Sequence, residues 1–153
     1  MSDAARDPAP AWTADRAHLA GSAPYEASAG YARAVRVGPF VYVAGTTGLG
    51  DDGRVVAGGA YAQARRALEI VVGALARAGA RPEDVVRTRL YVTAAEHAAD
   101  ATRAHAEAFG RVRPAATLVV VAALIDPAML VEVEADAVVG AGAPTGPPAG
   151  AGA

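Results

Sequence analysis

Two residue types that carry much of enzyme chemistry are missing from this chain. All 14 basic side chains are arginines, so there is no lysine, and there is no cysteine. Without lysine the chain cannot form a side-chain Schiff base or hold a pyridoxal cofactor covalently. Without cysteine it has no thiol nucleophile, thiolate metal site or disulfide. We therefore expect no cofactor, and acid–base work would fall to carboxylates, hydroxyls and histidines.

The histidines and serines form no familiar catalytic or metal-binding set. His18 lies in an irregular stretch, His97 at the start of a helical stretch, and His105 on an apolar helical stripe. A lone histidine on such a stripe is more often a packed side chain than a catalyst. Three scattered histidines without cysteine do not predict a metal site. The serines all precede the predicted folded unit, which argues against a Ser-His-Asp triad. They are Ser2, Ser22 and Ser28.

Residues 48–53 match the pattern G-x-G-x-x-G that opens many dinucleotide sites. Two features oppose that interpretation. Asp51 and Asp52 would face the pyrophosphate, and residues 54–56 extend instead of opening a helix, whose N-terminus such a site needs. We expect a turn between extended segments here.

Charged side chains alternate with apolar ones along two predicted strands, 85–92 and 130–139. Alternation places one set under the helices and the other on the opposite face of the sheet. The set expected under the helices is Val86, Thr88, Leu90, Val92, Val131, Val133 and Ala135. The opposite set is Val85, Arg87, Arg89, Tyr91, Glu132, Glu134 and Asp136. The charged face is either solvated, with ion pairs that contribute little, or covered by another subunit.

The elements that must position these side chains follow from periodicity and turn residues. The predicted strands are 31–37, 40–45, 54–56, 85–92, 117–122 and 130–139. The predicted helices are 60–78 and 93–109. This order, β-β-(β)-α-β-α-β-β, predicts an α+β domain with two helices on one face of a mixed sheet.

Local signals set the ends of these elements. Gly38-Pro39 separates the first two strands and predicts a hairpin. Gly79 follows the first helix at the usual C′ position. Thr93 and Glu96 form a capping-box pattern that predicts the start of the second helix.

The predicted strand 117–122 is apolar on both sides. Val119 and Val121 have the opposite parity to Leu118 and Val120. Strands of this kind are usually covered on both faces. The pattern is compatible with a subunit interface and does not by itself decide for one.

Length and composition indicate one domain between two irregular ends. Of the 153 residues, we predict an N-terminal arm over 1–28, partly disordered, a folded domain over 29–139, and a disordered tail over 140–153. The net charge of −2 and pI near 5.9 argue against nucleic acid as a partner. No apolar run is long enough to cross a membrane and no leader pattern is seen, so we expect a cytoplasmic protein.

Several sequence blocks, in order, resemble the RidA (YjgF) family over about residues 21–139. They are the stretches 30–38, 41–46, 61–68, 78–80, 83–93, 109–115 and 130–135. The resemblance implies a chorismate-mutase-like fold and a homotrimer whose sheets form a central barrel, with ligand clefts between subunits. It also implies a small-molecule substrate, because RidA members hydrolyse reactive enamines and imines to keto acids and ammonia.

The resemblance also suggests site residues. Glu132 matches the family's water-orienting carboxylate, and Tyr31, Thr46 and Thr47 lie where the family lines its cleft. In the RidA subgroup an arginine that holds the substrate carboxylate follows a Pro-Ala pair, and this chain has Ala116 there. Arg89 and Arg113 are candidate replacements for it.

Both arginines also have structural interpretations. Arg89 could pair with Glu132 or Glu134 across the sheet, and Arg113 could be a surface residue. Three functional hypotheses follow: an imine hydrolase of altered substrate range, a non-catalytic trimer that binds a small metabolite, and, least favoured given the acidic pI, an endoribonuclease.

Overall fold

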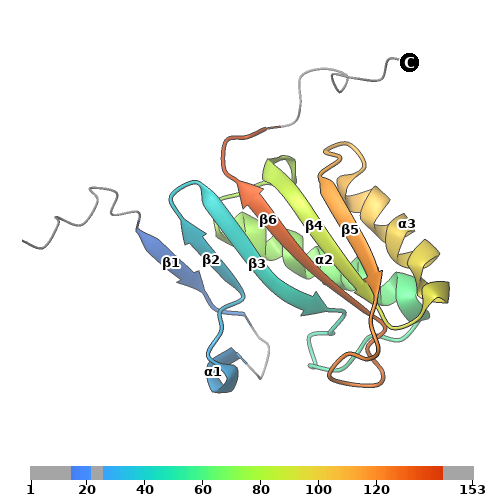
Figure 1. Cartoon of the computed structure of the whole chain (residues 1–153). Coiled ribbons are helices and arrows are strands. Elements are labelled where there is room, and N and C mark those ends of the chain that lie inside the picture. Colours follow the sequence, from blue (N-terminus) through green and yellow to red (C-terminus); the bar gives the residue numbers. More distant parts are fainter. Residues whose placement is uncertain (1–14, 22–25, 143–153) are drawn as a thin grey trace, which may run out of the picture.

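The computed structural model describes residues 15–21 and 26–142, and they form a single layer of β-sheet covered on one face by two helices (Figure 1). The six strands are ordered β1-β2-β3-β6-β4-β5. Their bounds are Arg16–Leu19 (β1), Ala34–Val37 (β2), Phe40–Thr47 (β3), Val85–Val92 (β4), Ala115–Val120 (β5) and Val131–Val138 (β6). All neighbours pair antiparallel except β4 and β5, which are parallel. The predicted mixed α+β architecture is confirmed.

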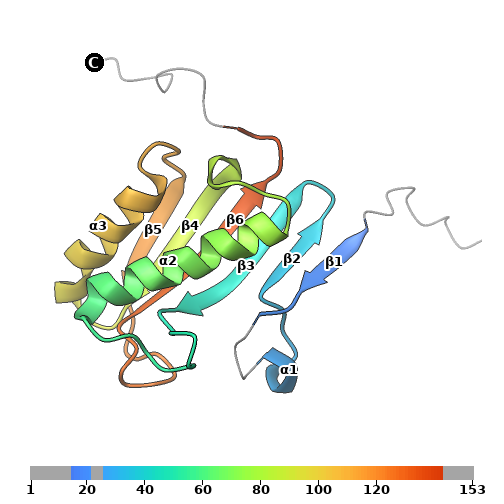
Figure 2. The same ribbon diagram turned by 180° about the vertical axis from the view of Figure 1, so that it is seen from behind.

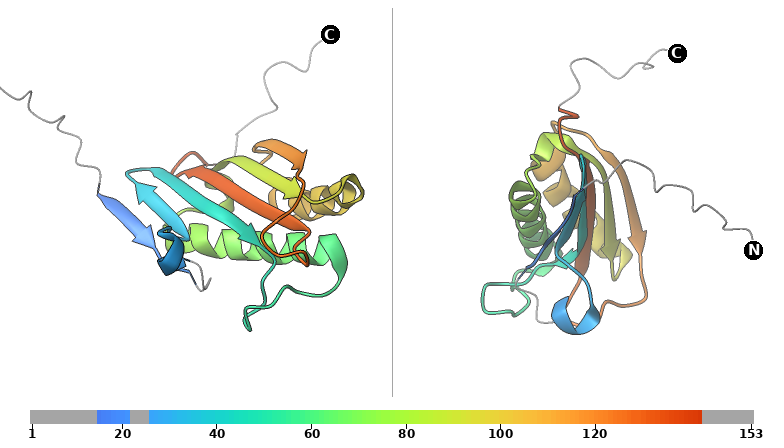
Figure 3. Two further views of the ribbon diagram at one scale, coloured as in Figure 1. Left: turned by 60° about the horizontal axis from the view of Figure 1, so that its bottom comes forward. Right: turned by 90° about the vertical axis from the view of Figure 1, so that its left-hand side faces the viewer.

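Both long helices lie on the same face of the sheet (Figures 2 and 3). They are α2 (Gly59–Arg77) and α3 (Ala98–Phe109); α1 (Glu26–Ala29) is a single turn. Two short 3₁₀ turns, Pro82–Asp84 and Ala95–His97, flank β4. The opposite face of the sheet, here called the open face, carries no element of this chain in the described ranges. None of the described helices is long and apolar enough to cross a membrane.

The hairpin and the first helix end where the sequence predicts. Val37 pairs with Phe40 across Gly38-Pro39, and Gly38 takes a φ of 57° that glycine accepts without strain. At the end of α2 the amide of Gly79 donates to Ala76 and the amide of Ala80 donates to Leu75. These two bonds form a Schellman motif that satisfies the last carbonyls of the helix.

The alternation predicted for β4 is wrong at its first two residues. Val85 is buried and Val86 is exposed, the reverse of the expectation, while Thr88, Leu90 and Val92 are buried as predicted. The register against β6 shifts between Val85 and Arg87. A β-bulge of this kind inserts one residue and so reverses the facing of everything on one side of it.

The predicted capping box does not form. The amide of Thr93 remains tied to the sheet by a bond to the carbonyl of Leu130, and a 3₁₀ turn follows. The helix α3 begins at Ala98 without a side-chain cap. Continued pairing with the sheet therefore delays the helix by about one turn.

The sheet extends into the segment that the sequence analysis set apart as an arm. Strand β1 pairs with β2 in register from Arg16 to Leu19, and Glu26 in α1 is buried. The brief strand predicted at 54–56 reduces to one bridge between Leu49 and Val55. Expectations for residues 1–14, 22–25 and 143–153 lie outside the described residues.

Candidate functional site

A cavity of about 650 Å³ opens where the C-terminal end of β3 meets α2. Its walls come from the 45–53 segment, one flank of α2, the 123–129 loop and the start of β6. Of the predicted site residues, the cavity brings together Tyr31, Thr46, Thr47 and Glu132. Its size falls within the range of about 300–1,000 Å³ found for small-molecule sites.

Glu132 is the carboxylate of the cavity that is available for chemistry. Its side chain is half-buried, and no described residue gives it a hydrogen bond or ion pair within contact distance. Burial raises its pKa, the nearby Glu134 raises it further, and Arg33 partly offsets both. A carboxyl group tuned in this direction is better suited to exchange protons near neutral pH.

The backbone of β3 makes room for that carboxylate. The register of β3 against β6 shifts between Val43 and Thr46, beside Gly45. A Cβ on Gly45 would lie 2.5 Å from the Glu132 Oε1 atom. A side chain at position 45 would therefore push the Glu132 carboxylate aside, and glycine leaves it in place.

Arg33 is a buried cation that the sequence analysis did not single out. Its guanidinium forms an ion pair with Glu26 at 3.2 Å and donates to the Gly45 carbonyl at 3.1 Å and to Thr46 Oγ1 at 2.7 Å. The carbon at the centre of the guanidinium lies 6.0 Å from the ring centroid of Tyr31. Arg33 thus holds the end of β3, the start of β2 and α1 together beneath the cavity.

The sequence does not indicate that Arg33 is buried in an ion pair, because no periodic pattern links it to its partner Glu26. Glu26 lies seven residues earlier in a stretch with no periodicity. An arginine at the head of an alternating strand is ordinarily a solvated residue. Only the burial of both partners distinguishes this pair, and burial is not readable from the sequence.

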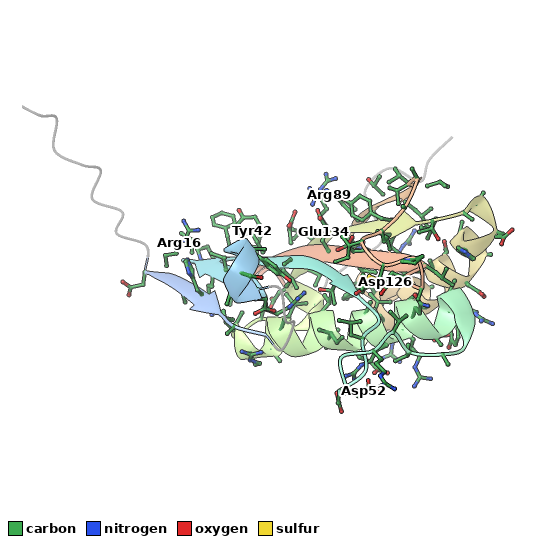
Figure 4. All side chains as sticks on the ribbon, turned by 90° about the horizontal axis from the view of Figure 1, so that it is seen from below. Arg16, Tyr42, Asp52, Arg89, Asp126 and Glu134 are labelled. Carbon is green, nitrogen blue, oxygen red and sulfur yellow. The ribbon has the colours of Figure 1, made fainter. Side chains whose placement is uncertain are left out.

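Three predicted substrate-binding residues do not line the cavity in this chain. Arg89 lies on the open face, where it contacts Glu134 at 2.5 Å and Asp136 at 3.3 Å (Figure 4). The hydrogen bond with Glu134 is the main cause that raises its pKa. Arg113 and Ala116 are exposed at the start of β5, away from Glu132. Arg89 therefore has the structural pairing that the sequence left as an alternative.

The glycine-rich segment 48–53 forms a tight turn, as expected, and becomes a wall of the cavity. The amide of Gly50 donates to the carbonyl of Arg54 at 2.8 Å, and Gly53 has a φ of 76°. Arg66 on α2 anchors the turn by bonds to the Leu49 carbonyl and, at 2.6 Å, to Asp51. This turn with its two aspartates precedes no helix N-terminus directly, so it does not form a phosphate cradle.

A buried amide anchors the loop on the other side of the cavity. The Gln63 side chain donates to the carbonyl of Ala128 at 2.9 Å and accepts from the amide of Leu130 at 2.8 Å. The 123–129 loop is thereby fixed to α2 before the chain enters β6. Figure 4 shows Asp52, on the 48–53 turn, well apart from the Arg89–Glu134 pair.

The histidines take no part in the cavity. His105 lies 2.8 Å from Thr88 Oγ1 and packs on Phe109, and its partial burial lowers its pKa. His18 lies on the exposed edge strand β1, within 2.8 Å of Arg16. Among the described residues no three His, Cys, Asp or Glu side chains cluster as metal ligands.

Comparisons with known proteins agree with the fold. A family model described as Endoribonuclease L-PSP matches residues 21–139. An uncharacterized protein of Streptomyces coelicolor is 42% identical over 118 residues, which cover 77% of this chain and 88% of that one. A RutC family protein of Pyrococcus abyssi is 33% identical over 106 residues, covering 69% of this chain and 83% of that one.

Solved structures show the same family. Rv2704 of Mycobacterium tuberculosis, described as a member of the YjgF/YER057c/UK114 family, is 48% identical. The match has a TM-score of 0.73 and covers 82% of this chain and all of that one. RidA from the Antarctic bacterium Psychrobacter sp. PAMC 21119 is 26% identical with a TM-score of 0.68, over 80% of this chain and 94% of that one. The chain belongs to the YjgF/Rid family.

Proposed function

We propose that this protein hydrolyses reactive enamine or imine intermediates to keto compounds and ammonia, with a substrate range that differs from the RidA subgroup. The observation that carries the proposal is Glu132, a half-buried carboxylate of raised pKa at the wall of a cavity of about 650 Å³. Its carboxylate has no partner among the described residues, so it can accept a proton from a bound water.

The reaction needs one group that moves protons. A water oxygen bonds to the imine carbon while Glu132 takes a proton from that water and returns one to the nitrogen. In the adduct, Glu132 takes the proton of the new hydroxyl group and passes a proton to the nitrogen, so that the carbon–nitrogen bond breaks and ammonia leaves with a carbonyl behind it. An enamine enters the same path after protonation at carbon. Tyr31, Thr46 and Thr47 supply hydroxyl groups along the same wall.

The altered range is inferred from Ala116, which lies outside the cavity of its own chain and would face a cleft only across the proposed subunit interface. A desolvated arginine–carboxylate contact is strong and geometrically specific, and an alanine methyl cannot replace it. Small amino-acid-derived imines, whose carboxylate would need that contact, are therefore expected to be poor substrates.

The proposal includes a homotrimer in the cytoplasm, with no cofactor and no nucleic-acid partner. The open face supports an assembly because large apolar side chains are exposed on it. Phe40 and Tyr42 alternate with the buried Val41 and Val43, and Val119 pairs with Tyr91 at the outer strand. Exposed apolar patches of this kind usually mark interaction surfaces.

The test is keto-product release from imines generated in situ, from 2-aminoacrylate to imines with larger side chains. Glu132→Gln is expected to lower the rate by about 10²–10⁴-fold, as for loss of a general acid–base group. Asp136→Asn is the matched control, because Asp136 lies on the same strand and pairs with Arg89 but does not shift the pKa of Glu132. No rate above buffer for any imine, also with Ala116→Arg, would contradict the hydrolase and favour a metabolite-binding protein.

A further inference from the structure

The cavity continues along α2, beyond the part that the proposed reaction uses. Its α2 wall is one stripe of side chains at helical spacing. The stripe comprises Arg66, Ile70, Gly73, Ala74 and Arg77. From the first to the last of these the helix rises about 16 Å. A three-carbon imine at Glu132 would occupy a small part of this length.

Gly73 keeps the middle of the stripe open. It lies inside α2, where glycine weakens a helix relative to alanine. Its backbone does not require glycine, because its φ is not in the left-handed region and a Cβ there would meet no atom within 4 Å. The absence of a side chain at residue 73 leaves this part of the cavity wall open.

Much of the cavity lining is apolar. Ile70 and Ala74 flank Gly73 on α2, and the 123–129 loop contributes Leu124 and Met129. Such a surface favours an aliphatic or aromatic body and offers little to a small polar molecule.

Arg77 ends the stripe with a charge that the cavity does not neutralise. Arg33 is paired with Glu26, and Arg66 with Asp51. The Arg77 guanidinium bonds to the carbonyl of Ala20, and within the described ranges no carboxylate lies within ion-pair distance of it. Its other N–H groups have no hydrogen-bond partner among the residues that the structure describes, so they can donate to an anion in the cavity.

We propose that this α2 subsite binds the far end of an elongated ligand with a terminal anionic group. The anion, a carboxylate or a phosphate, contacts Arg77, the apolar body lies along Gly73, and the other end reaches Glu132. If the proposed hydrolysis holds, the substrates are imines on a chain or ring system several carbons long with a remote anion. This inference rests on the proposed function only for the group placed at Glu132.

The experiment is calorimetric titration of the full-length protein with octanoate, octyl phosphate, 8-aminooctanoate and, for comparison, acetate. We expect the eight-carbon anions to bind much more tightly than acetate. Arg77→Gln should weaken octanoate about tenfold or more, as for loss of a charged hydrogen-bonded contact. Gly73→Leu should abolish octanoate binding by filling the wall, while thermal unfolding shows that the helix is no less stable. A preference between octanoate and octyl phosphate identifies which anion the subsite selects.

Matched controls lie on the same helix outside this cavity. Arg65→Gln makes the same change as Arg77→Gln, and Ala76→Leu introduces the same side chain as Gly73→Leu, both at exposed positions, and both should leave octanoate binding unchanged. Absence of binding by both octanoate and octyl phosphate, or equal binding by wild type and by either Arg77→Gln or Gly73→Leu, overturns the inference. Glu132→Gln should weaken 8-aminooctanoate alone. If Glu132→Gln lost turnover but Arg77→Gln bound octanoate as wild type does, the α2 subsite would be contradicted and the proposed hydrolase would not.

Discussion

Two carboxylates near the cavity have opposite environments, and the difference assigns their roles. Glu26 is buried against the Arg33 guanidinium and also accepts from the Gly21 amide at 2.5 Å. It is fully engaged, and its removal would leave an uncompensated buried cation. Glu132 is half-buried with no such partner, so its ionised form is poorly stabilised. A carboxylate in that state is costly for folding and useful for proton transfer.

The cost at Glu132 predicts a gain in stability on its removal. Its pKa is raised above the ordinary 4.5. The protonated form is therefore favoured by folding, and that contribution to stability is present at low pH and lost as pH rises through the folded pKa. Glu132→Gln, which mimics the neutral form, should be as stable as wild type near pH 4 and more stable near pH 7. Denaturant unfolding at the two pH values measures this, and an equal difference at both would contradict it.

Asp84 predicts the opposite pH dependence. Its buried carboxylate accepts from the amides of Arg81 at 2.9 Å, Gly140 at 3.1 Å and Gly142 at 3.4 Å. The bond from Arg81 is the main cause that lowers its pKa. Because its folded pKa is lowered, its stabilisation is fully present above the ordinary aspartate pKa and is lost progressively as pH falls from there through the folded pKa.

Asp84→Ala should lower the free energy of unfolding at pH 7 by about 2–3 kcal/mol, because three amides lose their acceptor. Asp100→Ala is a control, since that carboxylate pairs only with exposed Arg103 on α3 in the described structure. If Asp84→Ala lowered the free energy of unfolding by the same amount at pH 3 as at pH 7, the ionised carboxylate would not be the source of the loss.

At the scale of elements, the cavity depends on how closely the 48–53 turn approaches α2. A Cβ on Gly48 would lie 2.5 Å from the carbonyl oxygen of Gln63 and 2.7 Å from its Cα. Both are backbone atoms of a helix, which cannot move aside as a flexible side chain can. The helix and the turn are therefore packed at a distance that only glycine allows.

Gly48→Ala should destabilise the fold by about 1–3 kcal/mol, as overpacking against a rigid neighbour does. Gly73→Ala, at a position in α2 where a Cβ meets no other atom, should instead stabilise the fold by about 1 kcal/mol. Thermal unfolding of the two variants compares them directly. A stable Gly48→Ala protein with unchanged imine turnover would show that the turn can retreat without affecting the site.

The elements were predictable where one local signal decides them. The strand-turn-strand at Gly38-Pro39 and the end of α2 at Gly79 need no distant partner. The β4 bulge, which buries Val85 instead of Val86, depends on pairing with β6 and has no composition signal. The same holds for α3, whose start is delayed because Thr93 stays paired with Leu130.

The site residues also separate into those that the sequence predicts and those that it does not. Tyr31, Thr46, Thr47 and Glu132 were placed by family blocks, and the structure gathers them at one cavity. The Arg33–Glu26 pair and the α2 wall were missed for physical reasons. An apolar stripe that lines a cavity has the same periodicity as one that packs in a core, and only the exposure of Gly73 and Arg77 separates them.

At the scale of the whole molecule, the open face is the largest feature that one chain leaves unexplained. Arg89 forms ion pairs with Glu134 and Asp136 there. The exposed Tyr42 is in register with Asp136, and the half-buried Tyr91 is in register with Glu132. The parallel outer strand β5 presents Val119, 40% exposed, on this face, while Val120, 54% exposed, points to the other face. Parallel strands are rarely left uncovered, which supports the proposed trimer with this face inside.

The trimer predicts a specific failure when charge is placed on the outer strand. Val119 is in register with Tyr91, which in turn pairs with Glu132. Val119→Glu would add a carboxylate to a face that already carries Glu132, Glu134 and Asp136, and burying it between subunits without a partner is costly. Light scattering coupled to gel filtration should give three times the chain mass of 15.3 kDa for wild type and the single-chain mass for Val119→Glu. Ala99→Glu, on the exposed side of α3, should remain a trimer. A wild-type protein that runs as a monomer would remove the interface, and the cavity beside Glu132 would then have to work with the residues of one chain.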